Sequence, residues 1–175
     1  MKQSMLYPRA SASRRVVDLG GMWKFCLDWD GTGDAKGWKD GIPGEEKIPV
    51  PASFNDFYTD KDIREFAGDF WYETEVFVPG EWKEMHVDLR FAALTHRGTV
   101  YVNGREIISH EGGFLPFSAR IDDVVRWNEK NLVVVKGNNE LSFTSLPAGF
   151  TQTLKSGKKM VRPFFDFFNY AGIQR

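Results

Sequence analysis

Short segments in which apolar and polar residues alternate recur along the chain. In the first of them, Trp23, Phe25 and Leu27 alternate with Lys24 and Cys26. This alternation predicts β-strands with one buried face, because successive side chains of a strand point to opposite sides. Comparable segments follow at residues 70–78, 85–91, 117–121, 131–136 and 141–143.

The segment 100–108 predicts a tight β-hairpin. Its centre is Asn103-Gly104, and these two residue types tolerate the positive φ angles that a two-residue hairpin turn requires. We therefore expect the residues on either side of the turn to pair as antiparallel strands.

Helical periodicity is confined to residues 60–66 and 121–127, each long enough for a single turn. Turn-forming residues lie at 138–139 and at 147–149. Many short strands separated by turns predict an all-β fold, because two sheets packed face to face hide the apolar sides of both. We expect a jelly-roll β-sandwich of two antiparallel sheets, formed as a single domain by residues 1–175.

Aromatic residues make up 15% of the chain, which favours packed sheets or surfaces that stack on ligands. The net charge is −1 without a long run of Lys and Arg, which argues against a nucleic-acid partner. No apolar stretch of about 18 residues and no signal peptide pattern occurs, so we expect no membrane segment. Cys26 is the single cysteine, which excludes an internal disulfide, favours a cytoplasmic location and predicts a buried, inert thiol.

The last segment of the chain surrounds one carboxylate, Asp166, with aromatic residues. Burial of an unpaired carboxylate among rings costs on the order of several kcal/mol. Asp166 must therefore accept hydrogen bonds from backbone N–H groups, as the cap of a turn, or face a polar partner such as a sugar hydroxyl. Nothing in Gln174-Arg175 resembles a tail, so we expect the chain to be a piece of a longer protein.

Seven segments, taken in order, resemble the N-terminal sugar-binding domain of family-two glycoside hydrolases, a galactose-binding-domain-like jelly roll. Within that family the motifs are most similar to those of the bacterial β-glucuronidases. The likeness covers residues 6–175, and Asp-Phe-Phe-Asn-Tyr-Ala-Gly-Ile at 166–173 is its most specific motif. The segments are 19–25, 50–56, 67–72, 89–96, 100–104, 110–117 and 166–175.

The resemblance implies a bacterial parent enzyme that is a retaining glycoside hydrolase of terminal β-D-glucuronides and a homo-oligomer. In this family an immunoglobulin-like sandwich and a (β/α)8 barrel follow the N-terminal domain, and both catalytic glutamates lie in the barrel. Both domains are absent from this chain. The chain alone is therefore expected to be inactive, with the barrel as its intramolecular partner.

The resemblance also implies a role for Asp166. The matching aspartate of the family reaches the pocket of the barrel and hydrogen-bonds a hydroxyl of the bound sugar. Asn169 and Tyr170 are expected to support the loop, and Phe164 to line the rim of the pocket. Three other functions stay open, namely a sibling enzyme such as a β-galactosidase or β-mannosidase, a free-standing carbohydrate-binding module, and a scaffold that contributes to a subunit interface.

Chemistry elsewhere in the chain has weak support. Glu73 and Glu75 share one face of a predicted strand, about 6.5–7 Å apart. Retaining glycosidases hold two carboxyl groups about 5–5.5 Å apart, and an exposed polar stripe explains this pair better. No phosphate-binding or dinucleotide motif occurs. We expect no catalytic residue, metal or cofactor here, and the spacing typical of metal ligands is missing from His86, His96 and His110.

Overall fold

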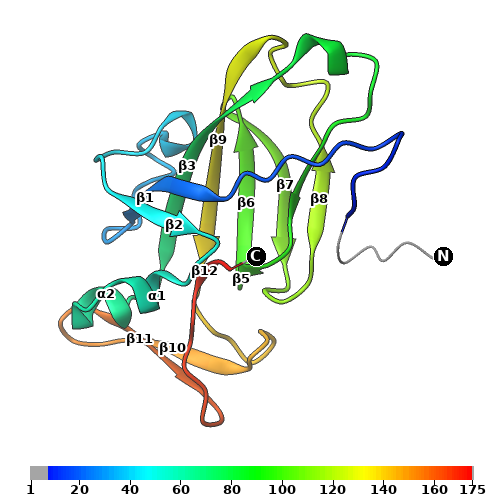
Figure 1. Cartoon of the computed structure of the whole chain (residues 1–175). Helices are drawn as coiled ribbons and strands as arrows, with labels where there is room; N and C mark the ends of the chain where they lie inside the picture. Colours follow the sequence, from blue (N-terminus) through cyan, green and yellow to red (C-terminus); the bar gives the residue numbers. More distant parts are fainter. Residues whose placement is uncertain (1–7, 175) are drawn as a thin grey trace.

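A six-stranded antiparallel sheet is the central element of residues 8–174, which the computed structural model describes (Figure 1). Its order is β2-β1-β3-β9-β6-β7, and the long strands β3 and β9 pair over their whole length. The six strands are β1 (Gly21–Leu27), β2 (Lys47–Val50), β3 (Asp69–Val78), β6 (Arg97–Val102), β7 (Arg105–Glu111) and β9 (Glu129–Asn138).

Two short sheets cover the inner face of the large one. One pairs β4 (Asp88–Phe91) with β8 (Phe117–Arg120), and the other pairs β5 (Leu94–Thr95) with β12 (Gly172–Ile173). Apolar side chains of all four strands join those of the large sheet in one buried core. The predicted all-β jelly-roll sandwich is confirmed, with a second layer made of two separate pairs of strands.

Strand β1 buries the face that the sequence predicts, and Trp23, Phe25 and Leu27 are at most 8% exposed. On β3 the residue Trp71 is also fully buried, although it points to the outer face. The segment 28–46, which includes the 3-10 turn η1 (Trp38–Asp40), covers it there. Part of the outer face of the sheet is therefore buried in a second, smaller hydrophobic core.

The hairpin at Asn103-Gly104 is confirmed. Both residues have positive φ, 51° and 79°, and they connect β6 to β7. The Asn103 side chain also donates to the carbonyl of Val124 at 3.0 Å and to Oδ1 of Asn131 at 2.8 Å. The turn is thus tied to the loop before β9 as well as to its own strands.

Several local predictions are wrong. Residues 141–143 form no strand, because Ser and Thr side chains bond the backbone groups here, as in the 2.8 Å bond from the Ser142 N–H to Ser145 Oγ. Strand β4 begins only at Asp88. The single turn expected within 121–127 is present, and the N–H groups of Val124 and Val125 donate to the Ile121 carbonyl at 3.0 and 3.1 Å. The sequence reading also missed β2, β5 and β12, and the hairpin of β10 (Gly149–Thr153) and β11 (Lys159–Pro163).

The helices are short. The helical turn predicted at 60–66 is α2 (Lys61–Arg64), where Asp60 caps the N-terminus by accepting from the N–H groups of Asp62 and Ile63. The others are α1 (Phe54–Phe57) and the 3-10 turn η2 (Gly80–Trp82). No helix between residues 8 and 174 has the length and apolar character needed to cross a membrane.

We expect Phe54→Ala to lower the free energy of unfolding by about 3–5 kcal/mol, because it leaves a cavity in a close-packed core. Phe54 is fully buried, with its ring centre 5.4 Å from that of Phe25 and 5.2 Å from that of Phe70. Urea unfolding measures the change. Phe77→Ala is the control, because Phe77 is 57% exposed; equal losses in the two variants would contradict this view of the core.

Candidate functional site

The loop of residues 164–171, called here the Asp166 loop, joins the β10–β11 hairpin to the short strand β12. Figure 1 shows this part of the chain, in red, running from the projecting hairpin back to the sandwich. Its first residue is held by the hairpin, since the Phe164 N–H donates to the Ala148 carbonyl at 3.1 Å.

Asp166 lies at the exposed part of this loop. Its neighbour Phe165 is 57% exposed, and within residues 8–174 no hydrogen bond or ion pair involves the Asp166 carboxylate. The alternative of a carboxylate that caps its own turn therefore has no support in the described hydrogen bonds. The group is available to a donor from outside the chain.

The end of the loop is anchored to the sandwich by buried amides. Asn169 donates from Nδ2 to the Asn139 carbonyl at 2.9 Å, and its Oδ1 lies 2.5 Å from Nε2 of His96. Two residues later, the Ala171 N–H donates to Oδ1 of the buried Asn55 at 2.7 Å. The chain then enters β12, so Asp166 lies only three residues from a rigid anchor.

The four residues predicted for the site lie on the same loop but differ in their exposure. Asp166, Phe164 and Tyr170 are all exposed, whereas Asn169 is half-buried and points into the protein. The Tyr170 ring packs on that of Phe168 at 4.7 Å. That Asn169 and Tyr170 support the loop stays a prediction.

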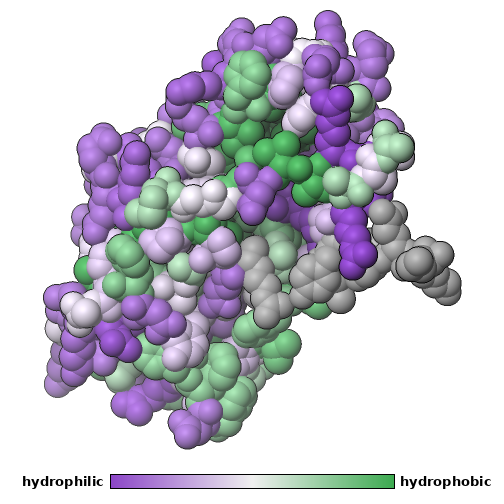
Figure 2. All heavy atoms as spheres, viewed as in Figure 1, coloured by the Kyte–Doolittle hydropathy of each residue, from purple (hydrophilic) through white to green (hydrophobic). Residues whose placement is uncertain are grey.

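An exposed aromatic patch, consisting of Phe143, Phe150 and Phe164, borders the start of the loop. The Phe164 ring centre is 5.2 Å from that of Phe143 and 6.3 Å from that of Phe150. Phe143 is 79% exposed and Phe164 52% exposed. Figure 2 shows apolar surface gathered over the lower part of the molecule, where the hairpin lies. Exposed apolar patches of this kind mark interaction surfaces.

Ion pairs hold the projecting hairpin against the body. Lys158, near the hairpin turn, lies 2.7 Å from Asp62 and 3.4 Å from Glu65 beside helix α2. Lys159 pairs with Glu140, which follows β9. These contacts orient the hairpin and with it the first residue of the Asp166 loop.

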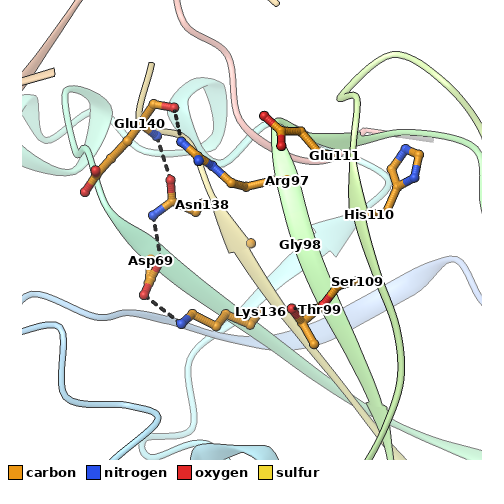
Figure 3. Close-up of a pocket in the computed structure, with 11 residues that line it drawn as sticks. Asp69, Arg97, Gly98, Thr99, Ser109, His110, Glu111, Lys136, Asn138 and Glu140 are labelled. Atoms are coloured by element: carbon orange, nitrogen blue, oxygen red, sulfur yellow. Dashed lines mark hydrogen bonds and ion pairs between the residues drawn. The ribbon is translucent and has the colours of Figure 1, made fainter. Parts of the chain in front are cut away.

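A separate polar cavity of about 480 Å³ opens on the outer face of the large sheet, and Asp166 does not line it (Figure 3). Its polar groups pair with one another. Arg97 donates to the Glu140 carbonyl at 2.9 Å, and Lys136 lies 2.9 Å from Asp69. Burial opposes the charge of Lys136, but hydrogen bonds to Asp34 and Asp69 raise its pKa above the ordinary value. The cavity is therefore a largely self-satisfied network that offers a ligand few unpaired charges.

The other groups considered from the sequence have structural roles. Glu73 accepts from the Ile42 N–H at 2.7 Å, and Glu75 pairs with Lys130 at 2.8 Å, so neither is a free carboxylate. Glu73 is half-buried, which corrects the expectation of an exposed stripe. Cys26 is half-buried, and burial raises the pKa of its thiol. In the described part of the chain, no group of His, Cys, Asp and Glu could hold a metal ion.

The sequence reading missed two residues that secure the loop. His96 and Asn139 lie 73 and 30 positions before Asn169, so no local pattern connects them with it. From the sequence, His96 is considered only as a metal ligand, for which its spacing is unsuited. The one available signal is that His96 ends the segment 89–96, one of the seven that resemble the family, and this does not connect it with Asn169.

Comparison with known proteins places the chain in a family. The model of glycosyl hydrolases family 2, sugar binding domain, matches residues 16–175. The β-glucuronidase of Streptococcus agalactiae is 39% identical over 175 residues, which cover 98% of this chain and 28% of that protein. Human β-glucuronidase is 36% identical over 197 residues, which cover 100% of this chain and 30% of that protein. The chain thus spans less than a third of the length of these relatives.

Solved structures agree with this result. Ruminococcus gnavus β-glucuronidase superimposes with a TM-score of 0.94 at 52% identity, over 100% of this chain and 29% of that chain. Lactobacillus rhamnosus β-glucuronidase gives a TM-score of 0.93 at 55% identity, over 98% of this chain and 29% of that chain. With its β-sandwich, its family match and these relatives, the chain belongs to the sugar-binding domain family of the family 2 glycosyl hydrolases.

Proposed function

We propose that the chain is the N-terminal domain of a β-glucuronidase and contributes Asp166 to the substrate pocket of that enzyme. The catalytic glutamates then belong to a barrel elsewhere in the same polypeptide. In this proposal the chain has two tasks. It packs against the barrel through the aromatic patch, and it presents the Asp166 carboxylate to a hydroxyl of the glucuronide.

The observation that carries the proposal is an exposed carboxylate without a partner in the described residues, on a loop anchored at both ends. When a neighbouring domain removes water from this region, the carboxylate needs a donor to offset its lost hydration. A sugar hydroxyl supplies one, and a hydrogen bond to a charged acceptor contributes about 1.5–3 kcal/mol.

The relatives favour a glucuronide over a galactoside. The proteins compared above are all β-glucuronidases, and similar structures of the Ruminococcus gnavus protein are complexes with D-glucaro 1,5-lactone and with a uronic isofagomine. A free-standing carbohydrate-binding module is the second candidate function. The exposed rings of Phe143 and Phe164 favour it, because aromatic rings stack on sugar faces.

Asp166→Asn in the full-length protein is expected to lower kcat/KM for 4-nitrophenyl β-D-glucuronide by about tenfold to a hundredfold, because a neutral amide is a weaker acceptor for the hydroxyl. The melting temperature should stay within about 1 °C, since the carboxylate has no partner to lose in the described structure. Asp123→Asn, on another loop, is the control, because its carboxylate forms only an exposed ion pair with Arg105 at 3.7 Å, which contributes little to stability. Wild-type kinetics in Asp166→Asn would refute this role.

Phe143→Ser tests the packing of the patch. In the 175-residue chain the change should cost less than about 0.5 kcal/mol, because Phe143 is 79% exposed there. In the full-length protein it should cost about 1.5–3 kcal/mol, since a contact that buries the ring is lost. Chemical denaturation of both proteins measures the difference. Equal effects in the two proteins would exclude Phe143 from the domain interface.

The isolated chain is expected to release no 4-nitrophenol from 4-nitrophenyl β-D-glucuronide and to bind glucuronic acid too weakly for calorimetry at millimolar concentration. A single hydrogen bond and a few exposed rings do not compensate for the entropy that a small ligand loses on binding. Titration of glucuronic acid and of neutral oligosaccharides measures this. Millimolar or tighter binding would favour the carbohydrate-binding module, and turnover would show that the chain has its own catalytic groups.

A further inference from the structure

His96 is a buried histidine at the junction of β5 and β6. It is 3% exposed, and its backbone is held on both sides. Its N–H donates to the Asn138 carbonyl at 3.0 Å, and its carbonyl accepts from the Gly112 N–H at 3.0 Å. The Phe114 ring and the imidazole pack edge to face, with ring centres 6.1 Å apart. The imidazole therefore has a defined position relative to the large sheet.

The imidazole binds the loop that carries Asp166 through one hydrogen bond. Nε2 of His96 lies 2.5 Å from Oδ1 of Asn169. The orientation of the Asn169 amide follows from its other contact, because Nδ2 must face the Asn139 carbonyl, which can only accept. Oδ1 then faces His96, so Nε2 carries the proton and donates it.

The other partner of Asn169 is equally rigid. Asn139 is fully buried, and its side chain accepts from the Gly68 N–H at 2.9 Å and donates to the Phe66 carbonyl at 2.7 Å. The Asn169 amide is thus held between two groups whose positions the core determines. Asp166 lies three residues before it, within the part of the loop that no other described side-chain hydrogen bond restrains.

Burial lowers the pKa of His96, and the positive charge of Arg97 acts in the same direction, although the hydrogen bond to Asn169 opposes them. Burial thus favours the neutral ring, and the bond to Asn169 places its single proton on Nε2. A neutral donor on a rigid strand junction is well suited to orient a loop, because it neither adds charge to the site nor moves.

We infer that His96 is a positioning residue of the sugar-binding site, which donates from Nε2 to Asn169 and so holds the loop that presents Asp166. The inference rests on the proposed function of Asp166 for its effect on catalysis. Its structural part, the restraint of the loop, stands independently of that function. His96 itself does not touch the substrate in this role.

The test uses His96→Phe in the full-length protein, alone and combined with Asp166→Ala. His96→Phe keeps an aromatic ring but removes the donor, and it should lower kcat/KM about tenfold through misplacement of Asp166. In the Asp166→Ala background the same change should cost less than about twofold, because the group that His96 positions is gone. His96→Gln, whose amide can donate from nearly the same place, should recover most of the loss. His86→Phe, at an exposed histidine, is the matched control.

Hydrogen exchange of the amides of Tyr170 and Ala171, which donate to the Phe168 carbonyl and to Oδ1 of Asn55, gives a readout that does not depend on catalysis. His96→Phe should raise these rates about tenfold and His86→Phe should leave them unchanged. If His96→Phe unfolds the protein, Asn169→Ala removes this bond together with the bond to the Asn139 carbonyl and must produce both effects. If His96→Phe folds, the double variant of His96→Phe and Asn169→Ala should lose no more than Asn169→Ala alone.

Unchanged exchange in the loop, or an equal loss of kcat/KM with and without Asp166, would overturn the inference. Faster exchange in His96→Phe together with wild-type kinetics in Asp166→Ala would separate the two claims. It would support the inference that His96 restrains the loop, and it would refute the proposed role of Asp166 in substrate binding.

Discussion

Burial of the inner face of the six-stranded sheet is the constraint on which the rest of the structure depends. That face carries fully buried aromatic side chains such as Phe70 and Tyr72, and no single neighbouring sheet covers it. Two short pairs of strands do so, and one of them needs β12, whose Ile173 is part of the core. The chain must therefore return from the projecting β10–β11 hairpin to the sandwich, and the Asp166 loop is the segment that makes this return.

Buried amide side chains hold the Asp166 loop in a defined position as it returns to the sandwich. The side chains of Asn55 and Asn139 each donate to one backbone carbonyl and accept from one backbone N–H, in keeping with the rule that buried polar groups are hydrogen-bonded. Through Ala171 and Asn169 they restrain one end of the loop, while the hairpin restrains the other. Asp166 lies between these anchors and, in the described structure, remains exposed and unpaired. The amides that support the loop thus have hydrogen-bond partners within the chain, whereas the Asp166 carboxylate, the candidate binding group, has none among the described residues.

The strands of the sandwich were readable from the sequence wherever a long alternating pattern met one buried face, as in β1, β3 and the β6–β7 hairpin. The alternation of apolar and polar residues did not predict the strands that are short or exposed. The strands β5 and β12 have two residues each, and the β10–β11 hairpin buries too little of either face to alternate clearly. Trp71 is a further case, because a long loop buries the outer face of its strand.

By itself the sequence determined the all-β class and the family, and it pointed to Asp166 as a candidate binding residue, because alternation, turn residues and the motif at 166–173 are local properties. Only the tertiary structure decided that Asp166 is exposed, that Asn169 points inward and that His96 and Asn139 hold it. Hydrogen bonds between residues 30 to 73 positions apart depend on how the sheets pack, and packing leaves no periodic trace in the chain. The anchor of the loop could therefore be found only in three dimensions.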